Sequence, residues 1–276
     1  NIYTRIINPT QGVVEERLAA LEGGVGALLF SSGQAATTGA LTNVAAAGDH
    51  IVASSGLYGG TDSLLRHSFP KLGIEVTFVE DPNDAAQWKA AAKENTKAFF
   101  GETIGNPKGD VLDLEAISAV AKEVGVPFIV DNTIATPYLL NPLKHGVDTV
   151  VHSATKYIGG HGTTIAGVVI DGGTFDYGAH GDKFPGFTTP DESYHGLVFA
   201  EANPHSLEPG ALGDHGGHQA GAKRRQPTLP PRSAERSDTT GSPVPHSRLD
   251  RLNGRPQQVH RFHTPCLQAV AQVLAP

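Results

Sequence analysis

A lysine suited to covalent chemistry follows one of the apolar runs of the sequence. Lys156 ends the segment Ser153-Ala154-Thr155-Lys156, which comes directly after the run 149–152. An amine that loses its hydration at the mouth of a crevice becomes a nucleophile toward a carbonyl carbon. Most lysines are solvated surface charges, so Lys156 alone does not establish a site.

A carboxylate occupies the corresponding place after another apolar run. Asp131 directly follows the segment Val126-Pro127-Phe128-Ile129-Val130, which has the composition of a buried strand. A buried carboxylate requires a partner. The alternative is an ordinary turn or a helix cap.

Two further segments add a phosphate site and an aromatic platform. Gly33 and Gln34 begin an alanine-rich stretch after the run 27–30, and free N–H groups at a helix start favour a phosphate. Tyr58 lies in the glycine-flanked loop 57–61, where its ring could stack on a flat ligand. The alternatives are a turn capped by Ser32 and a tyrosine that packs in a turn.

Together these residue types match pyridoxal 5'-phosphate (PLP). Its aldehyde needs a lysine amine, its pyridine nitrogen needs a carboxylate, and its phosphate needs hydroxyls and backbone N–H groups. Asp131 and Lys156 are separated by one crossover, which places both at the same edge of a parallel sheet. Phosphate ligands are available in Ser153, Thr155, Gly33 and Gln34.

The elements that must position these residues alternate between strand-like and helix-like patterns over residues 1–200. This alternation predicts an α/β fold with a largely parallel sheet and helices on both faces. Strands are predicted at 27–31, 50–54, 74–80, 97–102, 126–130, 148–152 and 165–170. Helices are predicted at 11–22, 34–47, 60–70, 83–94, 113–124 and 138–145.

Local signals refine two of these helices. Asp113 is predicted to cap the helix over 114–124, and Gly125 to end it. The pair Gly23-Gly24 is predicted to close the first helix. The apolar stripe predicted for that helix consists of Val13, Val14, Arg17, Leu18 and Leu21.

Composition excludes several classes of protein. Of the 276 residues 39% are hydrophobic, and no run approaches the ~18 apolar residues of a membrane span, so we expect a soluble globular protein without a membrane partner. The net charge of −7 gives no basic footprint for nucleic acid. The single cysteine, Cys266, can form neither an internal disulfide nor a cysteine-based metal site. We therefore expect the protein to be located in the cytoplasm and to bind no metal.

The segment 201–276 differs from the rest of the chain. It holds nine of the 21 basic residues and six of the 28 acidic ones, so the net charge is about −10 before it and +3 within it. Ten of the 19 prolines lie there, and only 265–274 could form a short helix. We predict a mostly disordered tail.

Five motifs, in order and spacing, resemble the PLP-dependent enzymes of cysteine and methionine metabolism. The resemblance covers residues 1–200 and implies a three-layer, aspartate-aminotransferase-like (fold type I) large domain that is incomplete at both ends. It stops where the family continues into a further domain that supplies an arginine for the substrate carboxylate. A shifted reading frame is one hypothesis for 201–276. The motifs are 1–10, Ser31 to Ala35, Leu57 to Thr61, Val130 to Thr133 and His152 to Tyr157.

The resemblance implies roles for individual residues. Lys156 would bind the cofactor covalently, Asp131 would pair with the pyridine nitrogen, and Tyr58 would stack on the ring. Asn106 would contact the ring hydroxyl, and Glu102 falls on a family position near the cofactor. Phosphate would be held by Gly33, Gln34, Ser153 and Thr155. Tyr3 and Arg5 would reach into the site of a neighbouring subunit, which implies a homodimer or homotetramer with shared sites.

Within the family, the segments 162–173, 183–188 and 194–197 are most similar to the O-acetylhomoserine sulfhydrylases. The implied reaction replaces the acetate of O-acetylhomoserine by sulfide or another thiol to give homocysteine. Lys156 would move protons, with Tyr58 and Tyr3 assisting the leaving group or the incoming thiol.

Other functions remain open from the sequence. Cystathionine γ-synthase, cystathionine γ-lyase and methionine γ-lyase activities belong to the same family. A truncated PLP-binding relic without catalysis is a second class. A dinucleotide-binding module around Gly23-Gly24-Val25-Gly26 is disfavoured, because these glycines end a helix and precede a strand, the reverse of the fingerprint.

Overall fold

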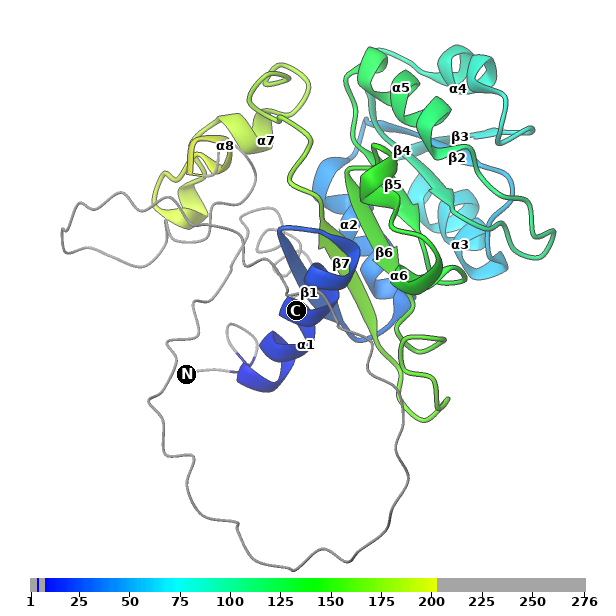
Figure 1. The fold of residues 1–276 in the computed structure, drawn as a ribbon. Helices are drawn as coiled ribbons and strands as arrows, with labels where there is room; N and C mark the ends of the chain where they lie inside the picture. The colour runs from blue at the N-terminus through cyan, green and yellow to red at the C-terminus, as the bar shows by residue number, and fades with distance from the viewer. Residues whose placement is uncertain (1–3, 5–7, 203–276) are drawn as a thin grey trace, which may run out of the picture. The chain divides into compact units, whose positions relative to one another are not determined.

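The computed structural model describes Thr4 and residues 8–202, which build a seven-stranded sheet with helices on both faces (Figure 1). Strands β3, β2, β4, β5 and β6 pair in parallel, and β7 pairs antiparallel with both β6 and β1. β1 therefore points the same way as β6. The order across the sheet is β1 (Gly26–Phe30), β7 (Gly167–Asp171), β6 (Thr149–His152), β5 (Phe128–Asp131), β4 (Thr96–Glu102), β2 (His50–Ser54) and β3 (Glu75–Val79).

The helices lie near the predicted positions, but two predicted helices are divided. The stretch predicted as a helix over 138–145 is interrupted at 140–141, because Asn141 precedes Pro142 and is extended, and it continues as a 3₁₀-turn. The stretch predicted as a helix over 60–70 is an α-turn, a π-turn and a 3₁₀-turn in succession, and Pro70 has no N–H to continue an α-helical ladder. The α-helices are α1 (Pro9–Glu22), α2 (Gly33–Val44), α3 (Gly59–Ser63), α4 (Ala85–Ala91), α5 (Leu114–Val124), α6 (Thr136–Leu139), α7 (Pro185–Thr188) and α8 (Phe199–Ala202). The other helical turns are η1 (Leu64–Ser68), η2 (Phe69–Leu72), η3 (Pro142–His145) and η4 (Glu192–Tyr194).

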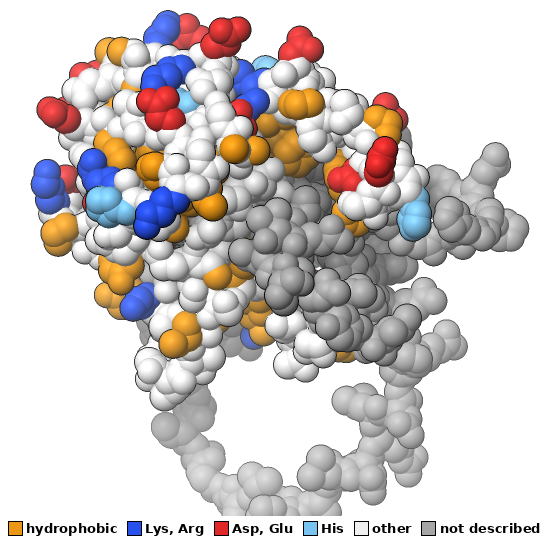
Figure 2. Space-filling model, turned by 180° about the vertical axis from the view of Figure 1, so that it is seen from behind, with side chains coloured by type: hydrophobic (Ala, Val, Ile, Leu, Met, Phe, Trp, Pro, Cys, Tyr) orange, Lys and Arg blue, Asp and Glu red, His pale blue; other side chains and the backbone are white. Residues whose placement is uncertain are grey.

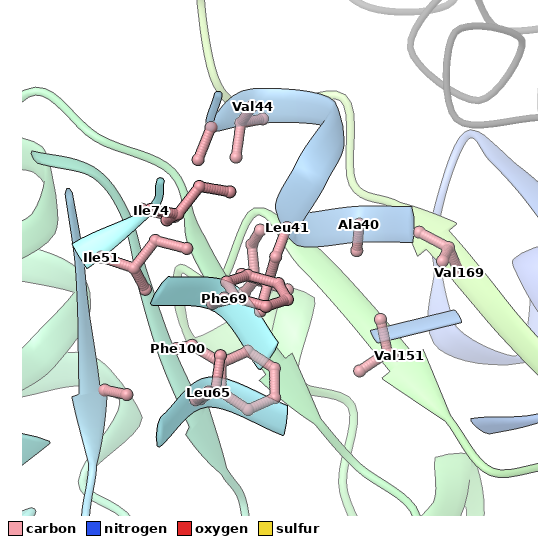
Figure 3. Close-up of a cluster of buried hydrophobic side chains, with 14 of the residues drawn as sticks. Ala40, Leu41, Val44, Ile51, Leu65, Phe69, Ile74, Phe100, Val151 and Val169 are labelled. Carbon is pink, nitrogen blue, oxygen red and sulfur yellow. The ribbon is translucent and has the colours of Figure 1, made fainter. Parts of the chain in front are cut away.

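Two apolar clusters lie on opposite faces of the sheet. On one face α2, η1 and η2 pack on strand residues such as Ile51, Phe100 and Val151 (Figure 3). On the other face α1, α4 and α5 pack on the alternate strand residues, among them Val150 and Phe128, with Trp88 fully buried. Successive strand residues point to opposite faces, so this alternation also decides which face each functional side chain uses.

The predicted caps of α5 and α1 are present. The Asp113 carboxylate accepts the amide of Ala116 at 3.1 Å, and Gly125 ends α5 at φ 72°. Gly23 ends α1 at φ 81°, in the left-handed region that glycine adopts without strain.

The stripe predicted for α1 is wrong. Leu18 is buried, but Val13, Val14 and Leu21 are exposed, and the residues that face the sheet include Glu15 and Glu22. The hydrophobic pattern fails here because α1 turns carboxylates inward, where donors from the sheet satisfy them. Val13, Val14 and Leu21 lie on its outward face, together with Glu16 and Arg17.

Basic and acidic side chains are interspersed on the face drawn in Figure 2. Among the described residues no helix is long and apolar enough to cross a membrane, and no three metal-ligating side chains are grouped. The tail predicted for 201–276 lies, from residue 203 onward, outside the described part of the chain.

Two buried carboxyl groups lie where β6 begins and β7 ends. Asp148 accepts the amide of Phe128 at 3.0 Å and the hydroxyl of Thr174 at 2.6 Å, while Asp171 accepts the amide of Gly173 at 2.8 Å. Burial raises the pKa of Asp171 to about 7, the charge of Asp148 adds to this, and the Gly173 hydrogen bond opposes it. The folded chain therefore holds a proton on Asp171 that the unfolded chain loses near pH 4.

We predict that Asp171→Asn stabilises the chain much more at pH 8 than at pH 5. Because the folded-state pKa of Asp171 is raised, the free energy of unfolding falls as pH rises from about 4 to 7. Asparagine retains an acceptor for Gly173 and removes this loss, which by linkage is about 4 kcal/mol at pH 8 and ~1.5 kcal/mol at pH 5. Urea unfolding at both pH values measures it, and an equal gain at pH 5 and pH 8 would contradict the prediction.

Candidate functional site

The carboxyl ends of five strands bring the predicted site residues to one edge of the sheet. β1, β2, β4, β5 and β6 run in the same direction, so the segments that follow them emerge together. In this way the fold places Gly33, Tyr58, Asn106, Asp131 and Lys156 at the same edge, although they are distributed over more than a hundred residues of sequence.

Close packing joins the start of α2 to the segment after β6. A Cβ added to Gly33 would lie 2.6 Å from Cβ of Ser153, so only glycine permits this approach. Ser32 caps α2 by accepting the Ala35 amide at 3.1 Å. The first N–H groups of the helix have no acceptor within it, and with the Ser153 hydroxyl beside them they form a cradle suited to a phosphate.

Asp131 is tied to the same cradle through Thr133. Its Oδ1 accepts the Thr133 amide at 2.8 Å, and the Thr133 hydroxyl accepts the Ser153 amide at 2.8 Å. Burial raises the pKa of Asp131, while hydrogen bonds from Thr133 and the charge of His152 oppose that rise. Thr133 was not predicted as a site residue, although its position two residues after a strand-end carboxylate is typical of such a support.

Glu102 connects Asp131 to the aromatic loop. The two carboxylates are register partners on β4 and β5, and Glu102 Oε1 accepts the Tyr58 amide at 2.6 Å. Burial and the charge of Asp131 raise the pKa of Glu102 to about 8, against the hydrogen bond from Tyr58. At neutral pH Glu102 is therefore mostly protonated, which relieves its repulsion with Asp131.

A hydrogen bond closes the ring of contacts. The Gln34 side-chain amide donates to the Thr61 hydroxyl at 3.0 Å, three residues after Tyr58. The Tyr58 ring lies over Gly60, where an added Cβ would meet it at 2.5 Å, and 49% of Tyr58 is exposed. The site thus runs in a circuit from the start of α2 through the Tyr58 loop, β4 and β5 to the segment after β6.

Lys156 and Thr155 differ in their hydrogen bonding: the Lys156 side chain makes no hydrogen bond within the described residues, whereas the Thr155 hydroxyl makes two. Lys156 is exposed on the turn after β6, and its side chain makes no hydrogen bond or ion pair within the described residues. The Thr155 hydroxyl donates to the Ala166 carbonyl at 3.1 Å and accepts the Ala166 amide at 3.0 Å. To donate to a phosphate, Thr155 would have to exchange the first of these bonds.

The remaining predicted residues lie beside the circuit or outside it. Asn106 is half-buried in the loop after β4, where an added Cβ on the neighbouring Gly105 would meet the Gly56 carbonyl at 2.9 Å. The loop carrying Asn106 therefore lies against the loop that leads to Tyr58. Tyr3 and Arg5 lie outside the described residues.

The residues present fit pyridoxal phosphate. The Gly33 cradle would be filled by any side chain, Asp131 is a carboxylate held at a strand end, and the Lys156 amine has no side-chain partner among residues 8–202. An anion site, an acid and a free amine on one circuit are the donor set that this cofactor requires.

Comparisons with known proteins agree with this geometry. The model of a family described as Cys/Met metabolism PLP-dependent enzyme matches residues 1–194. An O-acetyl-L-homoserine sulfhydrylase of Leptospira meyeri is 60% identical over 201 residues, 73% of this chain and 45% of the relative. Another, of Corynebacterium glutamicum, is 54% identical over 203 residues, 72% of this chain and 46% of the relative.

A solved structure shares the fold. It is described as an O-acetylhomoserine (thiol)-lyase of Campylobacter jejuni with N'-pyridoxyl-lysine-5'-monophosphate, and it matches with a TM-score of 0.70 and 41% identity over 75% of this chain and 50% of that one. The predicted fold type I class is thereby confirmed. The chain spans about half the length of the relatives it matches.

We predict that Gly33→Ala weakens PLP binding at least about tenfold, equivalent to ~1.4 kcal/mol. The new methyl group would push Ser153 away from the phosphate cradle. Gly12→Ala is the matched control, because a Cβ there meets nothing within 4 Å. Dissociation constants from absorbance titration measure the effect, and equal affinities for the two variants would contradict it.

Proposed function

The chain belongs to the Cys/Met metabolism PLP-dependent enzyme family, and from this premise we propose that it forms the PLP-binding part of an O-acetylhomoserine sulfhydrylase. The reaction replaces acetate at Cγ of O-acetyl-L-homoserine by sulfide and yields L-homocysteine and acetate. The observation that supports it best is the circuit of contacts joining Gly33, Tyr58, Glu102, Asp131 and Ser153.

Cofactor binding is divided between the two ends of the circuit. Bound PLP supplies an electron-accepting ring that stabilises negative charge on the substrate carbon skeleton. Gly33, Gln34 and Ser153 hold the phosphate, with Thr155 joining after it exchanges its bond to Ala166. Asp131 would pair with the pyridine nitrogen and keep a proton there, and a protonated Glu102 beside it would add no second negative charge.

Lys156 carries the proton transfers. It stands at the exposed end of the circuit, where its amine takes the proton from Cα of the substrate and moves protons at Cβ. Acetate leaves from Cγ with the electrons of the C–O bond, and hydrosulfide forms the new C–S bond there. Tyr58 stacks on the cofactor ring, Asn106 contacts its hydroxyl, and Tyr58 and Tyr3 assist the leaving and entering groups.

A second copy of the chain completes the site. The outward face of α1 and the adjacent α6 expose apolar side chains, with Val13 65% exposed, Leu21 55%, Tyr138 93% and Leu139 71%. This face begins directly after the segment with Tyr3 and Arg5, which serve the neighbouring copy's site. An exposed apolar surface of this kind is typical of an interface.

The proposal extends to compartment and to close alternatives. A chain with the single cysteine Cys266 suits the reducing cytoplasm.

Cystathionine γ-synthase, cystathionine γ-lyase and methionine γ-lyase activities differ in the thiol that enters or leaves, so assays with sulfide, cysteine and methionine separate them. Binding of PLP without any of these turnovers would instead fit a non-catalytic relic.

We predict that Lys156→Ala abolishes covalent capture of PLP. Borohydride treatment of the wild-type chain with PLP should add a pyridoxyl group to the peptide containing Lys156, because its amine stands at the exposed end of the circuit. Peptide mass mapping measures this, followed by sulfide-dependent homocysteine formation. Lys71→Ala, at an exposed lysine on η2, is the control, and a label retained in Lys156→Ala would reject the assignment.

We predict that the double variant Val13→Lys/Leu21→Lys dissociates the oligomer. Two charges on the outward face of α1 would remain desolvated in an interface between copies. Light scattering over a concentration series should show association weakened at least about tenfold. Leu72→Lys, at a 52% exposed leucine on η2, is the control, and a monomeric wild-type chain or equal loss in the control would contradict the proposal.

A further inference from the structure

Glu22 is buried where a carboxylate is least expected. It is the last residue of α1, fully buried, and lies at the helix end that carries partial negative charge. Burial of a carboxylate at such a position is costly unless donors surround it. The donors that Glu22 has gathered therefore indicate what the residue does.

Two side chains at strand ends, and Asn141 just before η3, donate to Glu22. Its Oε1 accepts from His152 Nε2 at 2.6 Å and from Asn132 Nδ2 at 3.0 Å, and its Oε2 accepts from Asn141 Nδ2 at 3.2 Å. His152 and Asn132 are themselves fully buried. Asn132 in turn accepts the Thr103 hydroxyl at 2.9 Å.

Each strand-end partner is the chain neighbour of a residue in the circuit. Thr103 follows Glu102, Asn132 follows Asp131, and His152 precedes Ser153. His152 alternates with Val151 along β6, so it lies on the α1 face with Val150, opposite the face of α2. Glu22 thus binds the carboxyl ends of β5 and β6 directly, and that of β4 through Asn132, from the face of the sheet opposite α2.

Among the described residues, Glu22 provides the one hydrogen bond that the His152 imidazole makes. Within the described residues Nδ1 of the imidazole has no hydrogen-bond partner, so the bond to Glu22 is the one that orients the ring. Glu22 from α1 and Asp131 from β5 are the charged groups that act on His152 in this region. The charge of His152 lowers the pKa of Asp131 against the larger effect of burial.

We propose that Glu22 is a positioning residue of the cofactor site, which acts through His152 and Asn132 to fix the strand ends that carry Asp131 and Ser153. This inference rests on the proposed PLP site. It assigns a role to a residue on the far face of the sheet that touches neither cofactor nor substrate.

Glu22→Gln tests the proposal, with Glu15→Gln as the matched control. Glutamine keeps the shape of the Glu22 side chain, but it replaces one of the two acceptor oxygens by an NH₂ group. That group would face the N–H donors of Asn132, Asn141 or His152. Glu15 lies on the inward face of the same helix, and its one hydrogen bond within the described part of the chain is from the Leu29 amide, at 2.9 Å, away from the strand ends of β5 and β6. Both variants therefore neutralise an inward carboxylate of α1.

The first measurement is hydrogen exchange without PLP. The amide of Asn132 donates to the Val151 carbonyl and that of Ser153 to the Thr133 hydroxyl, so these amides report on the strand ends. In Glu22→Gln we expect exchange at both at least about tenfold faster, and in Glu15→Gln no change there. Unchanged exchange in Glu22→Gln, or equal acceleration in the control, overturns the proposal.

The second measurement is PLP binding by the full chain. Glu22→Gln should bind PLP at least about tenfold more weakly and shift the pH midpoint of bound-PLP absorbance by about half a unit or more, with Glu15→Gln unchanged. If the wild-type chain binds no PLP, the proposed function fails, and the exchange measurement alone decides whether Glu22 holds the strand ends. Wild-type affinity and midpoint in Glu22→Gln overturn the proposal.

A double variant keeps the test decisive if Glu22→Gln does not fold. Glu22→Gln/His152→Gln replaces both members of the pair by neutral amides, so that neither buried group is left without its partner. We expect recovered thermal stability with the pH midpoint still shifted, because no charge remains beneath Asp131. Recovery of both stability and midpoint would show a structural role only and overturn the proposal.

Discussion

Backbone pairing between β4, β5 and β6 aligns Glu102, Asp131 and Val151 in one row across the sheet. This register places two carboxyl groups side by side at a water-poor edge, and their repulsion has to be relieved. It is relieved by a proton on Glu102, by the Thr133 hydrogen bonds on Asp131 and by the imidazole of His152 on the opposite face. The aromatic loop, the phosphate cradle and the lysine turn are attached to the same row.

The sequence predicted the sheet and the circuit because both depend on local signals. Apolar runs ending in polar residues located the strands to within two residues, and Gly33, Tyr58, Asp131 and Ser153 lie where parallel strands end. The supports of these residues were not predicted. The hydroxyls of Thr133 and Thr61 accept hydrogen bonds from Ser153 and Gln34, which lie 20 and 27 residues away along the chain, so local patterns do not predict these contacts.

Helix α1 shows where periodicity misleads. A stripe of Val13, Val14 and Leu21 predicts an inward face, yet Glu15 and Glu22 occupy it. Each carboxylate meets hydrogen-bond donors, the Leu29 amide for Glu15 and three side chains for Glu22. The apolar side chains are thereby turned outward, which links the buried polar network to the surface proposed for a second copy.

The inverted helix also has a consequence for the order of folding. Glu22 finds His152 and Asn132 at separations of 130 and 110 residues along the chain. Until β5 and β6 have paired, docking of α1 would bury a carboxylate without donors. Although α1 precedes β5 and β6 along the chain, we therefore expect it to stay exposed to solvent until the centre of the sheet has formed. Its docking is then a late folding step that requires a correctly paired sheet.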